Sequence, residues 1–438
     1  MKHAAFILAV VVLVGGCGGQ KSAPSGAEGE PETAASQVHA DLVVTTDRKV
    51  HPEPEPPELP KAGETFVDPT FGTTLMRVTD ERDGENGQVA YSYWPTFNRT
   101  STRFHLLCDK KALVYTFDPD AFKITGKEEL FATRPPDRRR PSWEDSIWSG
   151  TDPDVVFGRA ALKLWSYNVK DQSYTLVNDF VEDLPPEPKL STLWQMSKSE
   201  DDRTFCFTIK GRHPEYRSYG CIVWRRDDDK IVLNWKARGK FDEAHLDKTG
   251  QYVHIIDGER PIGSYVVGLR TGKVDGLTKN APDYGPGHSG YGRGTLIGYE
   301  NWKNRILLRK FSDPHHFLTL LDHKEDWSQD RHISMLANDE TWALVSLYVG
   351  NKLPSSGLFR NEIIQVATDG SRRVRRLCHH HAISRNYWDT PRANISRDGR
   401  FVAFTSNWGG RDQRDVFILK VPKPAKGIPA GQSTEHAP

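Results

Sequence analysis

The sequence predicts an all-β fold, a seven-bladed β-propeller closed by an N-terminal strand. Three observations lead to this prediction. Short runs of strand-forming residues alternate with Asp, Gly, Asn and Pro between residues 65 and 422, without a convincing amphipathic helix. A two-strand unit recurs roughly every 40 to 50 residues, which is the spacing of propeller blades. The chain also contains 12 Trp, 14 Tyr and 19 Phe, which stacked sheets can bury between them.

The clearest unit is the last one, in which the turn Asp398-Gly399 separates two strand-forming runs and a third run follows. A lone run at 74–79 precedes the first unit, so we expect it to complete the last blade and remove an exposed edge. Two β-sandwiches are the alternative. The six earlier pairs of runs are 103–107 with 113–117, 154–157 with 164–167, 204–209 with 221–224, 245–256 with 264–269, 294–299 with 305–310, and 342–348 with 361–366.

Residues 1–17 have the parts of a secretory signal peptide. Lys2 gives the positive charge, residues 4–14 form an apolar core, and small residues precede Cys17. The order Val-Gly-Gly-Cys resembles a bacterial lipobox, which implies that Cys17 is lipidated and becomes the first mature residue. An ordinary cleaved signal peptide and an uncleaved anchor helix are the alternatives, although the apolar run is short for a membrane span.

Composition divides the rest of the chain. Residues 18–64 are rich in Ala, Ser, Gly, Glu and Pro and predict a disordered tether, 65–422 form the propeller, and 423–438 form a disordered tail. We expect the protein to be lipid-anchored in the cell envelope. Gly18 after the cysteine favours the outer membrane of a diderm bacterium, at its periplasmic or surface face.

Several function classes are excluded or unsupported. The 59 basic and 58 acidic residues give a net charge of +1, so the chain lacks the excess of positive charge that is typical of nucleic-acid-binding proteins. The sequence contains no nucleotide-binding loop, dinucleotide fingerprint or nucleophile elbow.

We expect a monomer. Cys206 and Cys221 fall on adjacent predicted strands, where an exported protein could join them, whereas Cys108 and Cys378 are expected to be buried thiols.

The segment SRDGRFVAFTSNWG, residues 396–409, resembles the WD40-like repeats of TolB-type propellers, and residues 68–80 are similar to the first strand of that group. One enzymatic branch is the oligogalacturonate lyases. The resemblance to this branch implies a divalent metal, usually manganese, held by a Gln-x-x-His-x-His stretch and a further histidine. Gln329 and His332 match that stretch, whereas Ser334 replaces its second histidine.

The register of the repeats indicates a metal site independently. Aligned units place His245, His288 and His332 at equivalent points near the central funnel, and His380 lies in a histidine run before the last unit. Imidazoles with an oxygen ligand suit manganese, zinc or iron(II), and calcium is a further alternative. A single histidine at a blade entrance can equally be structural. The predicted metal ligands are His288, Gln329, His332 and His380.

A metal-bearing funnel suits β-elimination on a uronate, because neutralising the carboxylate makes the α-proton more acidic. The predicted catalytic residues are His245, Tyr387 and Arg392, and Arg392 is alternatively a clamp for a second carboxylate. Aromatic residues near the inner strands are predicted to stack on sugar rings, with blade packing as the alternative. They are Tyr93, Trp94, Trp148 and Trp194.

The leading hypothesis is therefore a lipid-anchored propeller that binds an acidic oligosaccharide in a metal-bearing funnel and acts as a polysaccharide lyase. The alternative is a non-catalytic TolB-like propeller that serves as a periplasmic protein-interaction module. The two differ in the histidine set, because an interaction module has no need for imidazoles at matching registers.

Overall fold

The computed structural model describes residues 44–109, 111–142, 144–184, 191–211, 217–258, 262–278, 287–300, 303–323, 326–350 and 355–423. The chain divides into the units Met1–Ala40 and Asp41–Pro438, and all described residues belong to the second unit. The predicted signal peptide, Cys17, and most of the tether and tail therefore lie outside the described residues.

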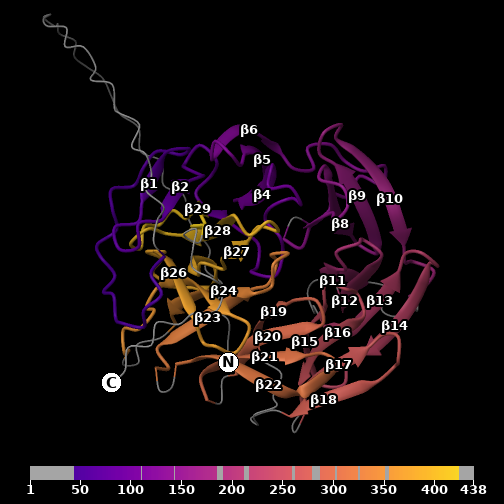
Figure 1. The fold of residues 1–438 in the computed structure, drawn as a ribbon. Helices are drawn as coiled ribbons and strands as arrows, with labels where there is room; N and C mark the ends of the chain where they lie inside the picture. The colour runs from indigo at the N-terminus through magenta and orange to yellow at the C-terminus, as the bar shows by residue number, and fades with distance from the viewer. Residues whose placement is uncertain are drawn as a thin grey trace, which may run out of the picture. The chain divides into compact units, whose positions relative to one another are not determined.

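Seven antiparallel sheets confirm the predicted seven-bladed propeller. Figure 1 shows the first strands β11, β15, β19 and β27 near the centre and the fourth strands β6, β10, β14, β18 and β22 towards the outside. Within the described ranges, the one helix is the 3₁₀ turn η1 (Tyr387–Asp389), and no helix is long and apolar enough to cross a membrane. The first six sheets repeat a simple up-and-down order, so each of these blades is built from one continuous stretch of chain.

The first three sheets follow one another along the chain. Their strands are β3 (Gly87–Gln88), β4 (Arg103–Cys108), β5 (Lys111–Asp118) and β6 (Lys123–Glu129); β7 (Ile147–Trp148), β8 (Val155–Ala160), β9 (Lys163–Asn168) and β10 (Ser173–Asp179); and β11 (Ser191–Lys198), β12 (Thr204–Gly211), β13 (Ser218–Arg225) and β14 (Lys230–Lys236).

The next three sheets have the same order. Their strands are β15 (Lys240–Leu246), β16 (Tyr252–Gly258), β17 (Ile262–Gly268) and β18 (Val274–Thr278); β19 (Gly287–Tyr291), β20 (Thr295–Glu300), β21 (Arg305–Lys310) and β22 (Asp313–Asp322); and β23 (Gln329–Ser334), β24 (Trp342–Val349), β25 (Glu362–Ala367) and β26 (Val374–His379).

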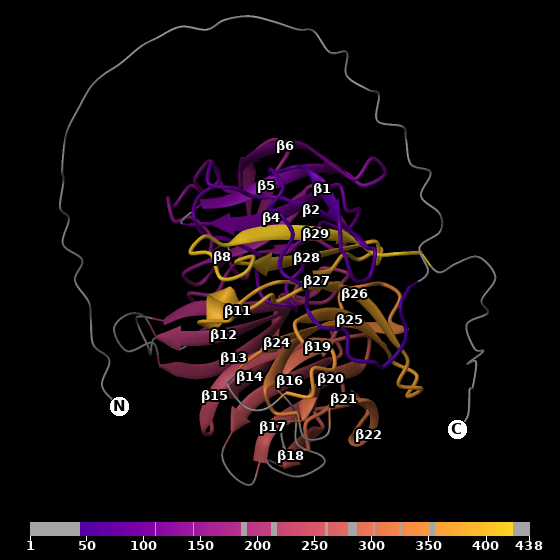
Figure 2. The same ribbon diagram turned by 90° about the vertical axis from the view of Figure 1, so that its left-hand side faces the viewer.

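The seventh sheet has five strands and combines two distant parts of the chain. Its order is β1 (Thr65–Val67), β2 (Thr74–Arg77), β29 (Asp415–Lys420), β28 (Phe401–Ser406) and β27 (Asn394–Ile395). β2 pairs antiparallel with β29, with Leu75 opposite Leu419 and Met76 opposite Ile418. Figure 2 shows β1 and β2 beside β29 and β28.

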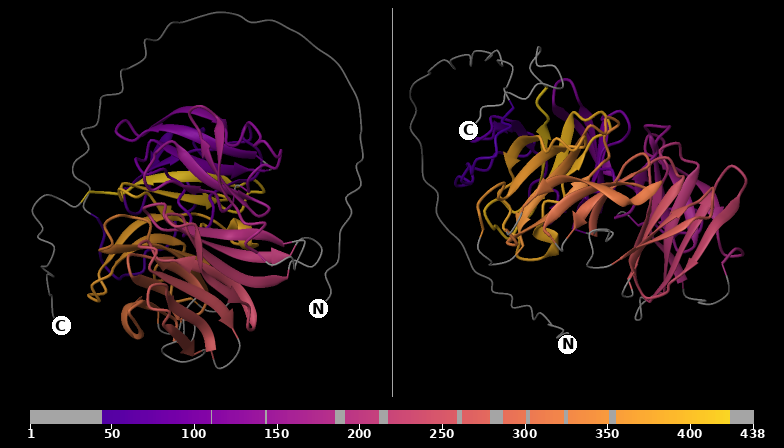
Figure 3. Two further views of the ribbon diagram at one scale, coloured as in Figure 1. Left: turned by 90° about the vertical axis from the view of Figure 1, so that its right-hand side faces the viewer. Right: turned by 60° about the horizontal axis from the view of Figure 1, so that its bottom comes forward.

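The middle strands of each sheet are the runs that the sequence predicted. They are apolar because neighbouring sheets cover both of their faces, and every residue of β25 and β28 is buried. Large aromatic side chains fill the space between sheets: the rings of Phe117 and Phe401, from the first and last sheets, meet edge to face at 5.1 Å. Figure 3 shows successive sheets packed against one another.

The disulfide that the sequence allowed between Cys206 and Cys221 is not formed. Both cysteines are free and buried, and each lies opposite a different residue: Cys206 opposite Val223, and Cys221 opposite Thr208. The two thiols are diagonal neighbours on β12 and β13, rather than a directly opposed pair. Cys108 and Cys378 are buried and free, as predicted.

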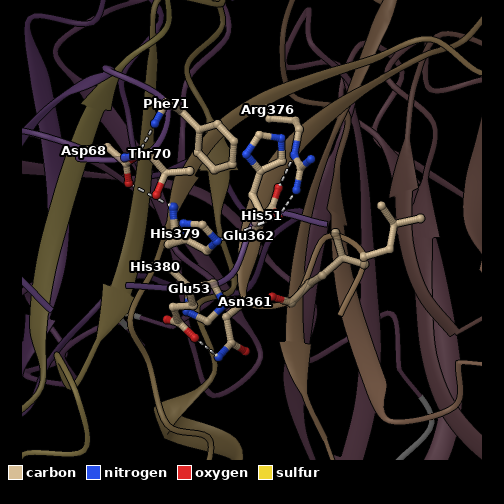
Figure 4. Close-up of polar contacts among 12 residues, drawn as sticks. His51, Glu53, Asp68, Thr70, Phe71, Asn361, Glu362, Arg376, His379 and His380 are labelled. Atoms are coloured by element: carbon tan, nitrogen blue, oxygen red, sulfur yellow. Dashed lines mark hydrogen bonds and ion pairs between the residues drawn. The ribbon is translucent and has the colours of Figure 1, made fainter. Parts of the chain in front are cut away.

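Residues 44–60, which the sequence assigned to the tether, contact the sixth and seventh sheets, and we call this segment the strap. The Arg376 guanidinium donates to the Lys49 carbonyl at 2.6 Å, and Asn361 donates to Glu53 at 2.7 Å. Figure 4 shows Glu53 and Asn361, and above them the buried ion pair between Arg376 and Glu362. The strap is thus held by specific hydrogen bonds to buried side chains.

Candidate functional site

A cavity of about 260 Å³ opens among the inner strands and the loops that lead into them. Its lining comes from the first, second, third, fourth, fifth and seventh sheets or their leading loops. The aromatic members are Tyr91, Tyr93, Trp94, Trp194 and Tyr387, and the polar members include Glu144, Asp145, Arg159, Gln195, Asp242, Glu243 and His288. A mixture of ring faces and planar polar groups at one place is typical of small-molecule sites.

Three of the four predicted sugar-stacking residues line this cavity. Trp94 is buried and donates from its indole nitrogen to the Met196 carbonyl at 2.8 Å. Tyr93 also lines the cavity, but the interpretation of Trp148 as a sugar platform is wrong. Trp148 is fully buried and donates to the Thr96 carbonyl at 2.9 Å, so it packs between blades.

Trp194, the third of these residues, is partly exposed. The Arg159 guanidinium carbon lies 4.5 Å from the centroid of its ring, and the Lys210 ammonium lies 5.3 Å away. Cations over an indole face are stabilised by the quadrupole of the ring. Arg159 also forms an ion pair with Asp145 at 2.5 Å, whereas the Lys210 ammonium has no ion-pair partner among the described residues.

Four carboxylates line the cavity, and their environments differ. Burial raises the pKa of Asp242, and the neighbouring Glu243 raises it further. Burial alone would also raise the pKa of Glu243, but His245 and a hydrogen bond from the Tyr93 hydroxyl outweigh it and bring the pKa to about 2. Burial and Asp145 raise the pKa of Glu144. Glu243 is therefore a fixed anion, while Asp242 and Glu144 hold their protons more readily.

The predicted base His245 lies behind Glu243 and does not line this cavity. Its Nε2 is 3.2 Å from the Glu243 carboxylate, and its ring packs between Tyr93 and Tyr291 at centroid distances of 4.1 and 4.9 Å. His245 instead lines a smaller cavity on the other side of Tyr93. An imidazole held by a carboxylate and two rings fixes the position of Glu243.

Tyr387 lies on η1 and lines the cavity, with Arg392 against its ring at 5.3 Å. Burial raises the pKa of Tyr387 to about 12, although Arg392 acts in the opposite direction. At neutral pH the phenol is therefore protonated, which suits a proton donor better than the base that the sequence predicted. Arg392 is buried and donates to Gln88 at 3.1 Å, and burial lowers its pKa.

His288 lines the cavity, and its orientation is defined. Its Nδ1 lies 2.7 Å from the Arg331 carbonyl and 3.4 Å from the Asp330 carboxylate. Because a carbonyl can only accept, Nδ1 carries the proton and the lone pair of the neutral ring is at Nε2. An imidazole oriented in this way can act as a general base or as a ligand.

Three non-glycine residues around the cavity adopt a left-handed backbone. The φ values are +53° at His288, +42° at Gln195 and +44° at Arg392. Such conformations cost about 1–3 kcal/mol each and persist where the surrounding structure imposes them, often at functional sites. The surrounding structure thus fixes the backbone at two residues that line the cavity, His288 and Gln195, and at Arg392 beside Tyr387.

The predicted pairing of His288 with His332 is found in the structure. Their rings are parallel within 6° at a centroid distance of 4.8 Å, and Tyr91 meets the His332 ring edge-on at 4.9 Å. Burial lowers the pKa of His332 well below its usual range, and His288 and Arg392 lower it further. His332 is therefore neutral, and its buried Nδ1 has no hydrogen-bond partner among the described residues.

The other predicted ligands do not join this histidine pair. The Gln329 amide donates to Asp326 at 3.2 Å and to the Leu358 carbonyl at 3.0 Å. Ser334, where the lyase pattern has histidine, accepts from the Ile395 N–H at 3.5 Å. Gln329 and His332 are three residues apart on β23, so their side chains leave opposite faces of the strand.

His380 cannot ligate a metal in this structure, because both of its ring nitrogens are bonded. Nδ1 accepts from the Ala382 N–H at 3.0 Å, and Nε2 donates to the Leu347 carbonyl at 2.8 Å. Figure 4 places His380 with His379 and the strap residue Glu53. The histidine run anchors the strap rather than reaching the funnel.

The donor set therefore does not fit the manganese site that the resemblance implies. Of the four predicted ligands, His288 and His332 alone come together, and among the described residues no group of three His, Cys, Asp or Glu side chains could hold a metal ion. Parallel rings also direct their in-plane lone pairs side by side instead of towards one point. Two imidazoles are fewer than the ligands that a protein metal site needs.

Comparison with solved structures shows what the fold is similar to. Oligogalacturonate lyase from Vibrio parahaemolyticus superposes with a TM-score of 0.59 at 12% identity, covering 82% of this chain and 97% of that chain. An oligogalacturonate lyase in complex with manganese gives a TM-score of 0.58 at 12% identity, covering 84% and 98%. The resemblance to the lyase branch is thus confirmed at the level of the propeller fold.

Sequence comparison adds nothing to this likeness. No family model matches the chain, and no curated protein matches it.

Sequence reasoning missed the carboxylates and Lys210. Glu144, Asp145, Asp242 and Glu243 occur as two adjacent acidic pairs, one just before the inner strand β7 and one near the start of the inner strand β15. Aligning the repeated units places the histidines at the inner strands, and the same alignment could have placed both acidic pairs there. No local pattern distinguishes Lys210 from other strand lysines, because its position over Trp194 depends on the pairing of β11 with β12.

Proposed function

We propose that the protein binds an acidic oligosaccharide in the central cavity and cleaves it by β-elimination. The observation that carries the proposal is the cavity itself, in which an oriented His288 lies with aromatic rings, the Arg159 guanidinium and four carboxylates, two of which, Asp242 and Glu144, have raised pKa values. The propeller is similar to oligogalacturonate lyases, which supports the choice of a uronate as substrate. The combination favours an enzyme over a purely structural propeller.

The reaction needs a base, a charge-neutralising group and a proton donor. His288 Nε2 accepts the proton α to the carboxylate, a carbon–carbon double bond forms, and the glycosidic C–O bond breaks. The proton on Tyr387 passes to the leaving oxygen, because its pKa of about 12 keeps it protonated until then. Asp330, 3.4 Å from His288 Nδ1, stabilises the imidazolium that results.

The cations beside Trp194 neutralise the substrate carboxylate in this proposal. Arg159 offers a planar fork, and Lys210 offers an ammonium without an ion-pair partner among the described residues. Positive charge near the carboxylate stabilises the enolate-like transition state, in which negative charge develops on that group. This assignment uses only protein groups, because the residues do not fit the manganese site of the lyase pattern.

Cleavage is tested by incubating the full-length protein with polygalacturonate, alginate and an ulvan-like polymer and following the absorbance of unsaturated uronates. We expect product from at least one polymer, formed in EDTA as well as in Mn²⁺. Product in Mn²⁺ that disappears in EDTA would show that a metal is needed and would overturn the metal-free assignment. No product from any polymer would overturn the lyase proposal.

A binding module is the second candidate, and the incomplete ligand set at Gln329 and Ser334 favours it. Calorimetry with the same oligosaccharides separates the two candidates. Saturable binding without turnover would support a non-catalytic propeller. Binding that requires Trp194 would place the ligand in the same cavity.

The proposal includes a lipid-anchored location in the cell envelope and a monomeric state. The location rests on the lipobox-like sequence ending at Cys17, which lies outside the described residues. Incorporation of labelled palmitate into the wild type, and its absence from Cys17→Ser, would support the anchor.

A further inference from the structure

A second, smaller cavity of about 70 Å³ lies on the other side of Tyr93 and Trp94, which line both cavities. The carboxylates of the larger cavity are replaced here by cations. Lys198, Lys248 and Arg397 line the small cavity, together with a single carboxylate, that of Glu200. The lining of the small cavity is therefore richer in cations than that of the larger one.

The charges around the small cavity form pairs, with one cation left over. Three cations have carboxylate partners: Lys198 pairs with Asp202, Lys248 with Glu340 at 2.9 Å, and Arg293 with Glu200 and with Glu340 at 3.7 Å. Arg397, the remaining cation of the lining, has no ion pair among the described residues.

Arg397 is the unpaired cation. Its guanidinium has no hydrogen-bond or ion-pair partner among the described residues, and the side chain is partly exposed. Burial lowers the pKa of Arg397, and the carboxylates of Asp202 and Glu200 offset this only in part. Burial also lowers the pKa of Lys198 to about 8, and Arg397 contributes to that shift by repulsion. Because the Arg397 side chain is partly exposed and unpaired among the described residues, its guanidinium is available to an anion that enters the cavity.

We propose that the small cavity binds a small oxyanion, either a carboxylate or a phosphate, on Arg397. The planar fork of a guanidinium matches the paired oxygens of both groups. Lys198 and Lys248, which also line the cavity, add to the positive field. A cavity of about 70 Å³ has room for only a few water molecules, so it excludes a sugar ring but admits an anion of this size.

This site is separate from the proposed reaction. Tyr93 connects the two cavities, because it donates to Glu243 at 2.6 Å and lines the oxyanion cavity as well. An anion on Arg397 would bind behind the partition and would not occupy the substrate cavity. The inference therefore stands or falls independently of β-elimination.

The test is calorimetric titration of the full-length protein with inorganic phosphate and, separately, with acetate in low-salt Tris buffer. We expect one site for the preferred anion, and a loss of affinity of about tenfold or more in Arg397→Met. Arg397→Lys keeps the charge but not the fork, so it should bind with intermediate affinity. Arg225→Met is the control, because Arg225 is half exposed and pairs with Asp228 away from the cavity.

Phosphate that binds more tightly than acetate would identify a phosphate site, and the reverse order would identify a carboxylate site. Binding that is equal in Arg397→Met and the wild type, or no binding of either anion, would overturn the proposal. Thermal unfolding gives a second readout. Without added anion, Arg397→Met should be at least as stable as the wild type, and a lower stability would mean that the guanidinium already has a partner.

Discussion

Replacing His288 by glutamine is expected to lower kcat on a cleavable polyuronate by about 10²–10⁴-fold, with little change in KM. Glutamine keeps a polar side chain of similar length but offers no basic nitrogen where His288 Nε2 lies. The backbone at this position is left-handed in the wild type, so melting temperature must be compared as well. Initial rates of unsaturated-uronate formation give the two kinetic constants.

The matched control for this variant is His316→Gln on β22. The His316 side chain is 88% exposed and pairs with Asp313 away from the cavity, so its replacement should leave kcat unchanged. Asp330→Asn is expected to have a smaller effect, about tenfold, and to shift the pH profile, because Asp330 acts through the His288 ring. A His288→Gln protein that retains the wild-type rate would exclude His288 as the base.

The folded protein is expected to lose stability steeply as the pH falls below about 6.5. Burial lowers the pKa of six histidines: to about 4 in His105, His379 and His380, to about 3 in His254 and His323, and well below its usual range in His332. These rings are neutral when folded, whereas in the unfolded chain they bind protons near pH 6.5. Their contribution is complete above pH 6.5 and is lost between that pH and about 4.

The size of the effect follows from linkage. Each such histidine contributes a limiting slope of about 1.4 kcal/mol per pH unit, so six give about 8 kcal/mol per unit. Domains are stable by about 5–15 kcal/mol, which places the acid-unfolding midpoint at about pH 5–6. Urea unfolding followed by tryptophan fluorescence between pH 8 and pH 5 measures the slope.

His105→Leu tests the origin of this slope. Neither ring nitrogen of His105 has a hydrogen-bond partner among the described residues, and burial is the cause of its pKa shift. The variant should lose about 2 kcal/mol less than the wild type between pH 8 and pH 5. Any packing cost cancels, because each protein is compared with itself. An unchanged dependence of the unfolding free energy on pH would show that His105 does not contribute to the loss of stability in acid.

The sequence was sufficient for the architecture because the middle strands of each blade are covered on both faces. That condition makes runs such as 401–406 almost wholly apolar and easy to recognise. The inner strands β7 and β27 have only two residues each, so they give no periodic signal. The outer strand β6 is mostly exposed, and its sequence resembles that of a loop.

The strap shows where composition misleads. Its proline-rich sequence is typical of an extended tether, and it is indeed nearly free of regular structure. However, the Trp408 indole donates to the Pro57 carbonyl at 2.8 Å, and Gly409 lies against Pro56. Partners more than 350 residues away cannot be inferred from local composition, so the ordered part of the segment was not predictable.

The alignment of equivalent positions in the repeated units was the most informative sequence signal for the site. It correctly predicted that His288 and His332 lie together, because equivalent positions of neighbouring blades meet near the axis. The chemistry of each ring was not predictable in the same way. The tautomer of His288 depends on a carbonyl of the next blade, and the role of His380 depends on the Leu347 carbonyl.

The pairing of β2 with β29 also constrains how the chain can be made. Leu75 and Leu419 are opposite each other although 344 positions separate them in the sequence. At the usual 5–20 residues per second, a ribosome needs roughly 17–70 s to synthesise that interval. Throughout this time β2 lacks its partner and offers an unpaired edge. The seventh sheet thus gains its β2–β29 pairing only after the strands of the other six sheets have been synthesised.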